Sequence, residues 1–127
     1  MHYLVRHIII ELNDCPFERI NDIQRLDQLL VDVAGALNTE VIAAISHQFQ
    51  PYGVTALLIV GASHLSIHSW PEYGYASFDM AVCTEGFDLP QIIEMVKQRV
   101  ESKRVNFIEF RRGLVQADDD HQQNSDG

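Results

Sequence analysis

The stretch SHLSIHSWPEYGYASFDMAVC, residues 63–83, holds more reactive side chains than a plain pair of strands and a turn would need. Serines, two histidines, a Trp-Pro-Glu-Tyr-Gly turn and a cysteine follow one another closely. Residues of these types permit three chemistries, namely metal binding, hydrolysis by a serine triad, and attack of a serine on its own backbone.

Metal binding would draw on His64 and His68, which have the four-residue spacing of zinc ligands on a helix. However, Leu65 and Ile67 alternate with polar residues, which predicts a strand. Four residues of strand span roughly 13 Å, whereas two nitrogens that share a zinc ion each lie about 2 Å from it. We therefore expect no metal site here.

Hydrolysis would need a Ser-His-Asp triad, and the side chains available for one are Ser63, Ser66, His68 and Asp79. The sequence Gly61-Ala62-Ser63-His64 lacks the second glycine of a nucleophile elbow. A triad is weakly indicated and stays open at this point.

Self-processing would begin with the Ser63 hydroxyl attacking the carbonyl of Ala62, which converts an amide into an ester. Small residues at Gly61-Ala62 allow the strained backbone that such an attack needs. β-Elimination then cuts the chain, and hydrolysis of the resulting dehydroalanine leaves a pyruvoyl group. This ketone can form a Schiff base with a substrate amine and accept the electrons released by decarboxylation.

Pyridoxal phosphate would be the rival electrophile, and it needs a lysine for its resting Schiff base. The only lysines are Lys97 and Lys103, far along the chain from the reactive stretch. We therefore expect no pyridoxal phosphate, which weakly supports an electrophile made from the chain itself.

Hydrophobic patterning places the reactive stretch within an α+β domain. Strands are predicted at residues 3–12, 40–49, 75–83 and 105–110, and one more strand has the segments 54–60 and 64–68 on either side of an interruption at Gly61-Ala62. Helices are predicted at 20–37 and after the capping residue Asp88. The predicted order is β-α-β-β-β-α-β, and we expect an antiparallel sheet with both helices on one face. The other face is left for a second protomer to cover.

Composition limits the classes of partner. The chain has 127 residues, enough for one domain, and a net charge of −9 without a Lys/Arg stripe. These features disfavour nucleic acid and anionic membranes as partners. The N-terminus does not resemble a secretory signal, and Cys15 and Cys83 are the only cysteines, so we expect reduced thiols and a cytoplasmic protein.

Longer motifs carry a resemblance to a known family. The motifs are FQPYGVT at 49–55, SHLSIHSWPEYGYASFD at 63–79, and Cys83. From Arg6-His7 to Gly113 the sequence resembles the short bacterial and archaeal type of S-adenosylmethionine decarboxylase, a pyruvoyl enzyme of polyamine synthesis. The resemblance implies a domain at 1–115 that is cut between Ala62 and Ser63 into chains 1–62 and 63–127. The polar, acidic composition of residues 116–127 separately predicts a disordered tail.

The resemblance also implies roles for individual residues in processing. Ser63 would become the pyruvoyl group, and His68 would remove its α-proton during elimination. Thr55, where the family usually has serine, would support the ester intermediate. Ala62 stands where the family usually has glutamate, which could change the rate of processing.

Further roles concern the substrate, S-adenosylmethionine. Cys83 would return a proton to the substrate carbon after CO2 leaves, Phe49 would stack on the adenine, and Glu72 would bind the ribose hydroxyls. Ser63 and Cys83 would come from one protomer of a homodimer, an αββα sandwich, and the remaining site residues from its partner.

Two alternatives stay open. Members of the same family can decarboxylate arginine or ornithine, so the same chemistry could act on either. A chain that never cuts itself would instead be a binding or regulatory homologue without catalytic activity.

Overall fold

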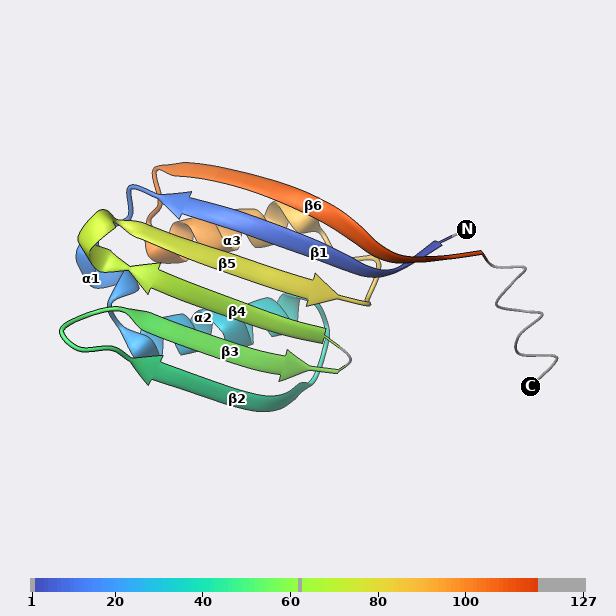
Figure 1. Cartoon of the computed structure of the whole chain (residues 1–127), viewed down its shortest axis with the longest axis horizontal. Helices are drawn as coiled ribbons and strands as arrows, with labels where there is room; N and C mark the ends of the chain where they lie inside the picture. Colours follow the sequence, from blue (N-terminus) through green and yellow to red (C-terminus); the bar gives the residue numbers. More distant parts are fainter. Residues whose placement is uncertain (1, 62, 117–127) are drawn as a thin grey trace.

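The computed structural model describes residues 2–61 and 63–116. Along the chain lie β1 (His2–Asn13), α1 (Phe17–Ile20), α2 (Ile23–Ala36), β2 (Val41–Gln48), β3 (Val54–Val60), β4 (Ser63–Trp70), the 3₁₀ turn η1 (Pro71–Tyr73), β5 (Tyr75–Val82), α3 (Leu89–Val100) and β6 (Arg104–Val115) (Figure 1). Ala62 and residues 117–127, which carry the predicted cleavage site and nearly all of the predicted tail, lie outside the described residues.

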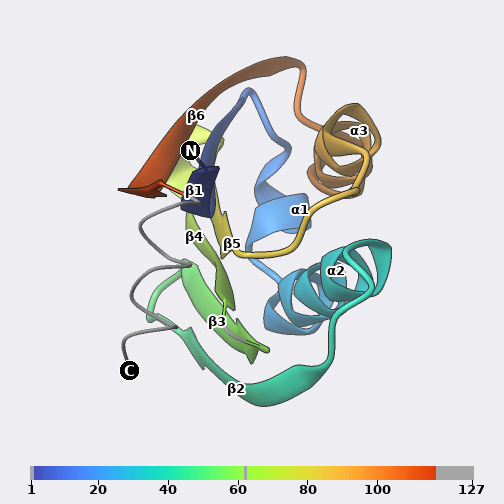
Figure 2. The same cartoon turned by 90° about the vertical axis from the view of Figure 1, so that its right-hand side faces the viewer.

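One sheet runs through the described residues, and its strands lie in the order β2-β3-β4-β5-β1-β6. Every neighbouring pair is antiparallel. Figure 2 shows the sheet from its edge, with α1, α2 and α3 all on the same side of it. The predicted α+β class, the antiparallel sheet and the one-sided helices are confirmed.

The two longer helices, α2 and α3, begin where aspartates cap them. The Asp22 carboxylate accepts hydrogen bonds from the backbone N–H groups of Gln24 and Arg25, and that of Asp88 accepts one from Gln91. Each cap satisfies backbone donors that have no partner inside the helix. These helices then bury their apolar stripes on the sheet, and the buried residues are Leu26, Leu29, Leu30, Val33, Ile92, Val96 and Val100.

The hydrophobic core lies between the helices and one face of the sheet. Alternate residues of β1, β3, β4 and β5 reach it, among them Ile8, Ile10, Leu58, Leu65 and Phe78. The opposite face, which we call the open face, exposes 69% of Ile45, 38% of Leu57 and 51% of Ile59. Apolar side chains on neighbouring strands are thus left uncovered in the isolated chain.

The element order differs from the predicted string by one strand. The segments on either side of the interruption at residues 61 and 62 are two strands of a tight hairpin, with Val60 opposite Ser63. Gly61 has a φ of +55°, a left-handed conformation that glycine adopts without a steric penalty, so the chain reverses there.

Two elements also differ from their predicted ranges by more than two residues. The helix predicted from Ile20 to Leu37 is divided, because α1 ends at Ile20 and Asp22 caps a separate helix. Strand β6 extends to Val115, beyond the predicted 105–110, because it pairs with β1 along its whole length.

Candidate active site

Ser63 and Cys83 lie together at one end of the sheet. Ser63 is the first residue of β4, and Cys83 follows Val82, the last residue of β5. Because these strands are antiparallel, the start of β4 lies beside the end of β5. The backbone N–H of Cys83 donates a hydrogen bond of 3.0 Å to the Ser63 Oγ. The contact fixes the serine oxygen beside the cysteine backbone.

A cavity of about 330 Å³ opens at this end, lined by His64, Ala81, Cys83 and Arg112 among others. The Cys83 thiol is exposed. The only other cysteine, Cys15, is buried, and burial raises the pKa of its thiol to about 11. Cys83 is therefore the cysteine with access to a solute.

A second group of the predicted site residues lies at the other end of β3 and β4. The Thr55 Oγ1 and the His68 Nδ1 are 3.0 Å apart and form a hydrogen bond. A cavity of about 300 Å³ beside them is lined by Phe49, Thr55, His68, Trp70 and Glu72. Aromatic rings, a carboxylate and a histidine therefore face one small space.

The Phe49 turn shapes one wall of this second cavity. The Phe49 N–H donates a hydrogen bond of 2.8 Å to the Gly53 carbonyl, which closes the turn. Gly53 has a φ of +111°, and a Cβ there would lie 3.3 Å from the Ser69 carbonyl oxygen. Glycine at this position lets the turn lie close to β4 and leaves the Phe49 ring 46% exposed.

The two groups are far apart within one chain. Ser63 and His68 stand at opposite ends of β4, five residues apart in an extended strand. At about 3.3 Å per residue, their α-carbons are separated by roughly 17 Å. One chain therefore contains two separate groups. The first is Ser63 with Cys83, and the second is Phe49, Thr55, His68 and Glu72.

The alternative of a serine triad fails on geometry. The Asp79 Oδ1 lies 3.3 Å from the His7 Nε2, and His68 is paired with Thr55. His68 also stands opposite Ser77 in the sheet, whereas Asp79 stands opposite Ser66. Asp79 therefore orients His7 and not His68.

His7 is a residue that sequence reasoning missed. Its ring lies on the open face, 6.5 Å from the ring of His64 in an edge-on arrangement. The signal that could have found it is the pairing of His7 with Ala81 in the sheet. That register joins strands distant in sequence, so local patterning did not reveal it.

Within residues 2–61 and 63–116, no three His, Cys, Asp or Glu side chains are placed so that they could hold a metal ion. His64 and His68 lie on a strand, as predicted. None of the described helices is both long and apolar enough to cross a membrane.

Comparisons with known proteins agree on one family. The family model for S-adenosylmethionine decarboxylase matches residues 6–113. The chain is 35% identical over 113 residues to an S-adenosylmethionine decarboxylase proenzyme of Thermotoga petrophila, which covers 89% of this chain and 87% of that protein. A Bacillus cereus protein, S-adenosylmethionine decarboxylase proenzyme 1, is 40% identical with the same coverage.

Solved structures agree with this assignment. The crystal structure of the adenosylmethionine decarboxylase from Aquifex aeolicus superposes with a TM-score of 0.84 at 26% identity, over 92% of this chain and 97% of that one. A Trypanosoma brucei AdoMetDC monomer shares the fold, with a TM-score of 0.62 at 14% identity, over 82% of this chain and 45% of that one. The chain belongs to the S-adenosylmethionine decarboxylase family.

Proposed function

We propose that this chain cuts itself at Ser63 and then decarboxylates S-adenosylmethionine, which yields CO2 and the aminopropyl donor for spermidine synthesis. Family membership supports the decarboxylase activity and its substrate. The observation that carries the assignment of residues is the 3.0 Å hydrogen bond from the Cys83 N–H to the Ser63 Oγ. A cytoplasmic location is part of the proposal.

Self-cleavage starts from the Ser63 oxygen. Its attack on the carbonyl carbon of residue 62 forms a carbon–oxygen bond, and the Ser63 nitrogen leaves as the amine, so the peptide becomes an ester. The Cys83 N–H restricts where this oxygen can lie, which favours a geometry suited to attack. Removal of the Ser63 α-proton then breaks the ester and releases the new carboxylate of residue 62.

A pyruvoyl group formed from Ser63 supplies an electrophilic carbonyl that can accept the electrons of the leaving carboxylate. The site fits an oxygen-bearing group, because an amide N–H already donates to an oxygen at this position. In the proposal, Cys83 holds the proton that returns to the substrate carbon. Its exposed position beside the cavity of His64 and Arg112 is compatible with this role.

The second cavity is assigned to the nucleoside of the substrate. An adenine needs a flat apolar partner, and Phe49 and Trp70 offer exposed rings beside the Thr55–His68 pair. Glu72 lines the same space, and a carboxylate can accept hydrogen bonds from both hydroxyl groups of a ribose. The assigned halves of the substrate site thus lie at opposite ends of one chain.

A homodimer resolves this separation in the proposal. Two copies packed through their open faces with two-fold symmetry would bury Ile45, Leu57 and Ile59, and could place Ser63 of one protomer near His68 of its partner. The resulting particle has helices outside and two sheets inside, an αββα sandwich.

Complementation tests the shared site. Ser63→Ala and His68→Ala chains are co-expressed, and intact masses report which chains are cut. If Ser63 and His68 act across the interface, a mixed dimer contains one complete pair. Random pairing then allows up to about half of the His68→Ala chains to be cut. If both residues act within one chain, the mixture shows no more cutting than the two variants expressed separately, which would overturn the shared site.

Release of labelled CO2 tests the substrate. The purified chain is expected to release CO2 from carboxyl-labelled S-adenosylmethionine much faster than from labelled arginine or ornithine, because the smaller amines leave the aromatic cavity unfilled. The control is a Phe49→Ala variant, in which KM for S-adenosylmethionine should rise by about tenfold through loss of ring stacking. Faster release from arginine or ornithine would contradict the proposed substrate.

A further inference from the structure

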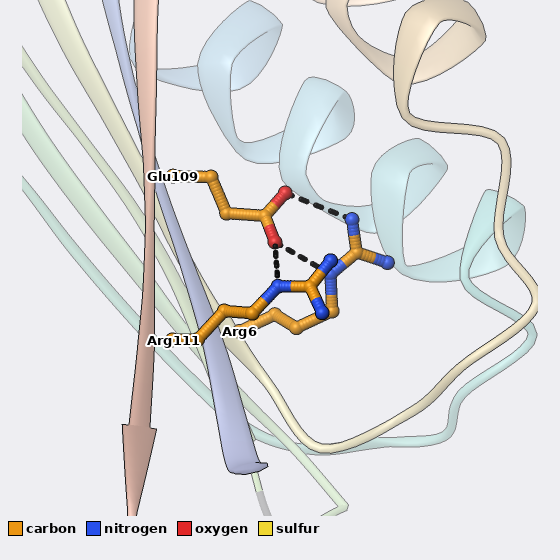
Figure 3. Close-up of polar contacts among 3 residues, drawn as sticks. All are labelled: Arg6, Glu109 and Arg111. Carbon is orange, nitrogen blue, oxygen red and sulfur yellow. Dashed lines mark hydrogen bonds and ion pairs between the residues drawn. The ribbon is translucent and has the colours of Figure 1, made fainter. Parts of the chain in front are cut away.

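A charged cluster lies on the helix-covered face of the sheet, across the sheet from the open face. Arg6 donates two hydrogen bonds to Glu109, from Nη2 to Oε1 at 2.8 Å and from Nε to Oε2 at 3.0 Å. The Nε of Arg111 donates a third, of 3.1 Å, to the same carboxylate (Figure 3). A carboxylate with these donors is held in one orientation, and Arg6 is held with it.

The cluster lies beside the connection that contains Cys83. Arg6 stands opposite Val82 in the sheet, one residue before Cys83. Residues 83–88 then join β5 to α3. Gly86, in the middle of this connection, has a φ of +80°, and no atom outside residues 85–87 lies within 4 Å of where a Cβ would be, so the backbone there meets little packing.

Two side chains of the connection are attracted to Arg6. Its guanidinium carbon lies 4.5 Å from the centre of the Phe87 ring, which is a cation–π contact. The negative charge of Glu85 also favours the charged form of Arg6 and, after the Glu109 contacts, contributes to raising its pKa. Phe87 in turn packs against the hydrophobic core. Arg6 therefore contacts the connection on one side and Glu109 on the other.

We infer that Arg6, fixed by Glu109 and Arg111, is a positioning residue that holds the 83–88 connection through Phe87 and so sets the place of Cys83 relative to Ser63. This inference rests on the proposed role of Cys83. Arg6 lies on the same face of β1 as Ile8 and Ile10, which are buried under the helices. It therefore lies across the sheet from the open face, away from the proposed substrate site. It acts only through the backbone that carries Cys83.

The test compares Arg6→Gln with a matched loss of an ion pair elsewhere on the same two strands. The control is Arg104→Gln, which removes the 3.2 Å contact from the Arg104 Nε to the Asp14 Oδ2 at the other end of β6 and β1. Hydrogen–deuterium exchange is followed in the peptide that spans residues 83–88, and kcat and KM are measured per cut chain.

For Arg6→Gln we expect faster exchange at 83–88 and a kcat lower by about tenfold with KM within twofold, because a displacement of about 1 Å can cost up to 10²-fold in rate. Arg104→Gln should change neither. Arg6→Lys keeps a charge over the ring but loses the two-pronged contact with Glu109, so its kcat should lie between those of Arg6→Gln and the unchanged chain.

Phe87→Leu keeps the Arg6–Glu109 pair and much of the buried volume, so it should reproduce the faster exchange even if Arg6→Gln folds poorly. Unchanged exchange in both variants would overturn the inference, and so would faster exchange with unchanged kcat. If the unchanged chain never cuts itself, the proposed function fails instead, and the exchange data still decide whether Arg6 holds the connection.

Discussion

A Ser63→Ala chain is expected to remain in one piece of 127 residues, whereas the unchanged chain yields two fragments that end and begin at residues 62 and 63. Alanine has no oxygen to attack the preceding carbonyl, so neither the ester nor the electrophile can form. Turnover should then fall to background, since enzymes typically supply about 10⁶-fold or more over the uncatalysed reaction. Intact-mass measurement and labelled CO2 release check both results.

Ser66→Ala is the matched control for this change. Ser66 lies on the same strand and is buried, with 6% of it exposed, so its replacement also alters the packing of β4. It leaves the Ser63 oxygen and the Cys83 N–H in place, and cutting should continue. If the Ser63→Ala chain were still cut, or if the Ser66→Ala chain stayed intact while the Ser63→Ala chain was cut, the nucleophile would have been assigned to the wrong serine.

Cys83→Ala is expected to separate cutting from turnover. The contact with the Ser63 oxygen comes from the backbone N–H of residue 83, which alanine retains, so fragments should still form. The thiol is lost, and general acid–base groups typically contribute roughly 10²–10⁴-fold to a rate. We therefore expect kcat per cut chain to fall by about 100-fold or more, measured as CO2 release after the cut fraction is determined by mass.

The second cysteine provides the control for Cys83→Ala. Cys15 is buried, and its Sγ lies 3.6 Å from the Leu12 carbonyl oxygen, far along the sheet from the Ser63 end. Cys15→Ala should reduce the free energy of unfolding without lowering kcat. Unchanged turnover in Cys83→Ala would remove this thiol from the reaction.

Local signals were sufficient for much of the fold. The apolar run at Val54–Val60 and the Asp88 cap depend on residues next to one another, and both elements appear where predicted. The extra strand was missed because the reversal of the chain between Val60 and Ser63 was taken as an interruption within a strand. With Val60 opposite Ser63, the same register places Thr55 opposite His68, so a hairpin prediction would have paired them.

Contacts between distant segments could not be predicted in this way. The Arg6–Glu109 pair joins residues 103 positions apart, and the His7–Asp79 pair depends on how β1 sits beside β5. Neither register follows from periodicity. If one strand is shifted by two residues along its neighbour, every side chain stays on the same face, so the hydrophobic pattern fits equally well. The proposed roles of Ser63 and Cys83 stay predictions, although the hydrogen bond from the Cys83 N–H to the Ser63 Oγ brings the two residues together.

The strand order has a consequence for a chain that has been nicked in the β3–β4 turn. The N-terminal fragment contains β1, β2 and β3, and the C-terminal fragment contains β4, β5 and β6. Because β1 is inserted between β5 and β6, the two fragments pair with each other along three ladders, which are β3–β4, β5–β1 and β1–β6. The severed halves are interleaved, so they should stay associated without a covalent link and separate only when the whole sheet unfolds.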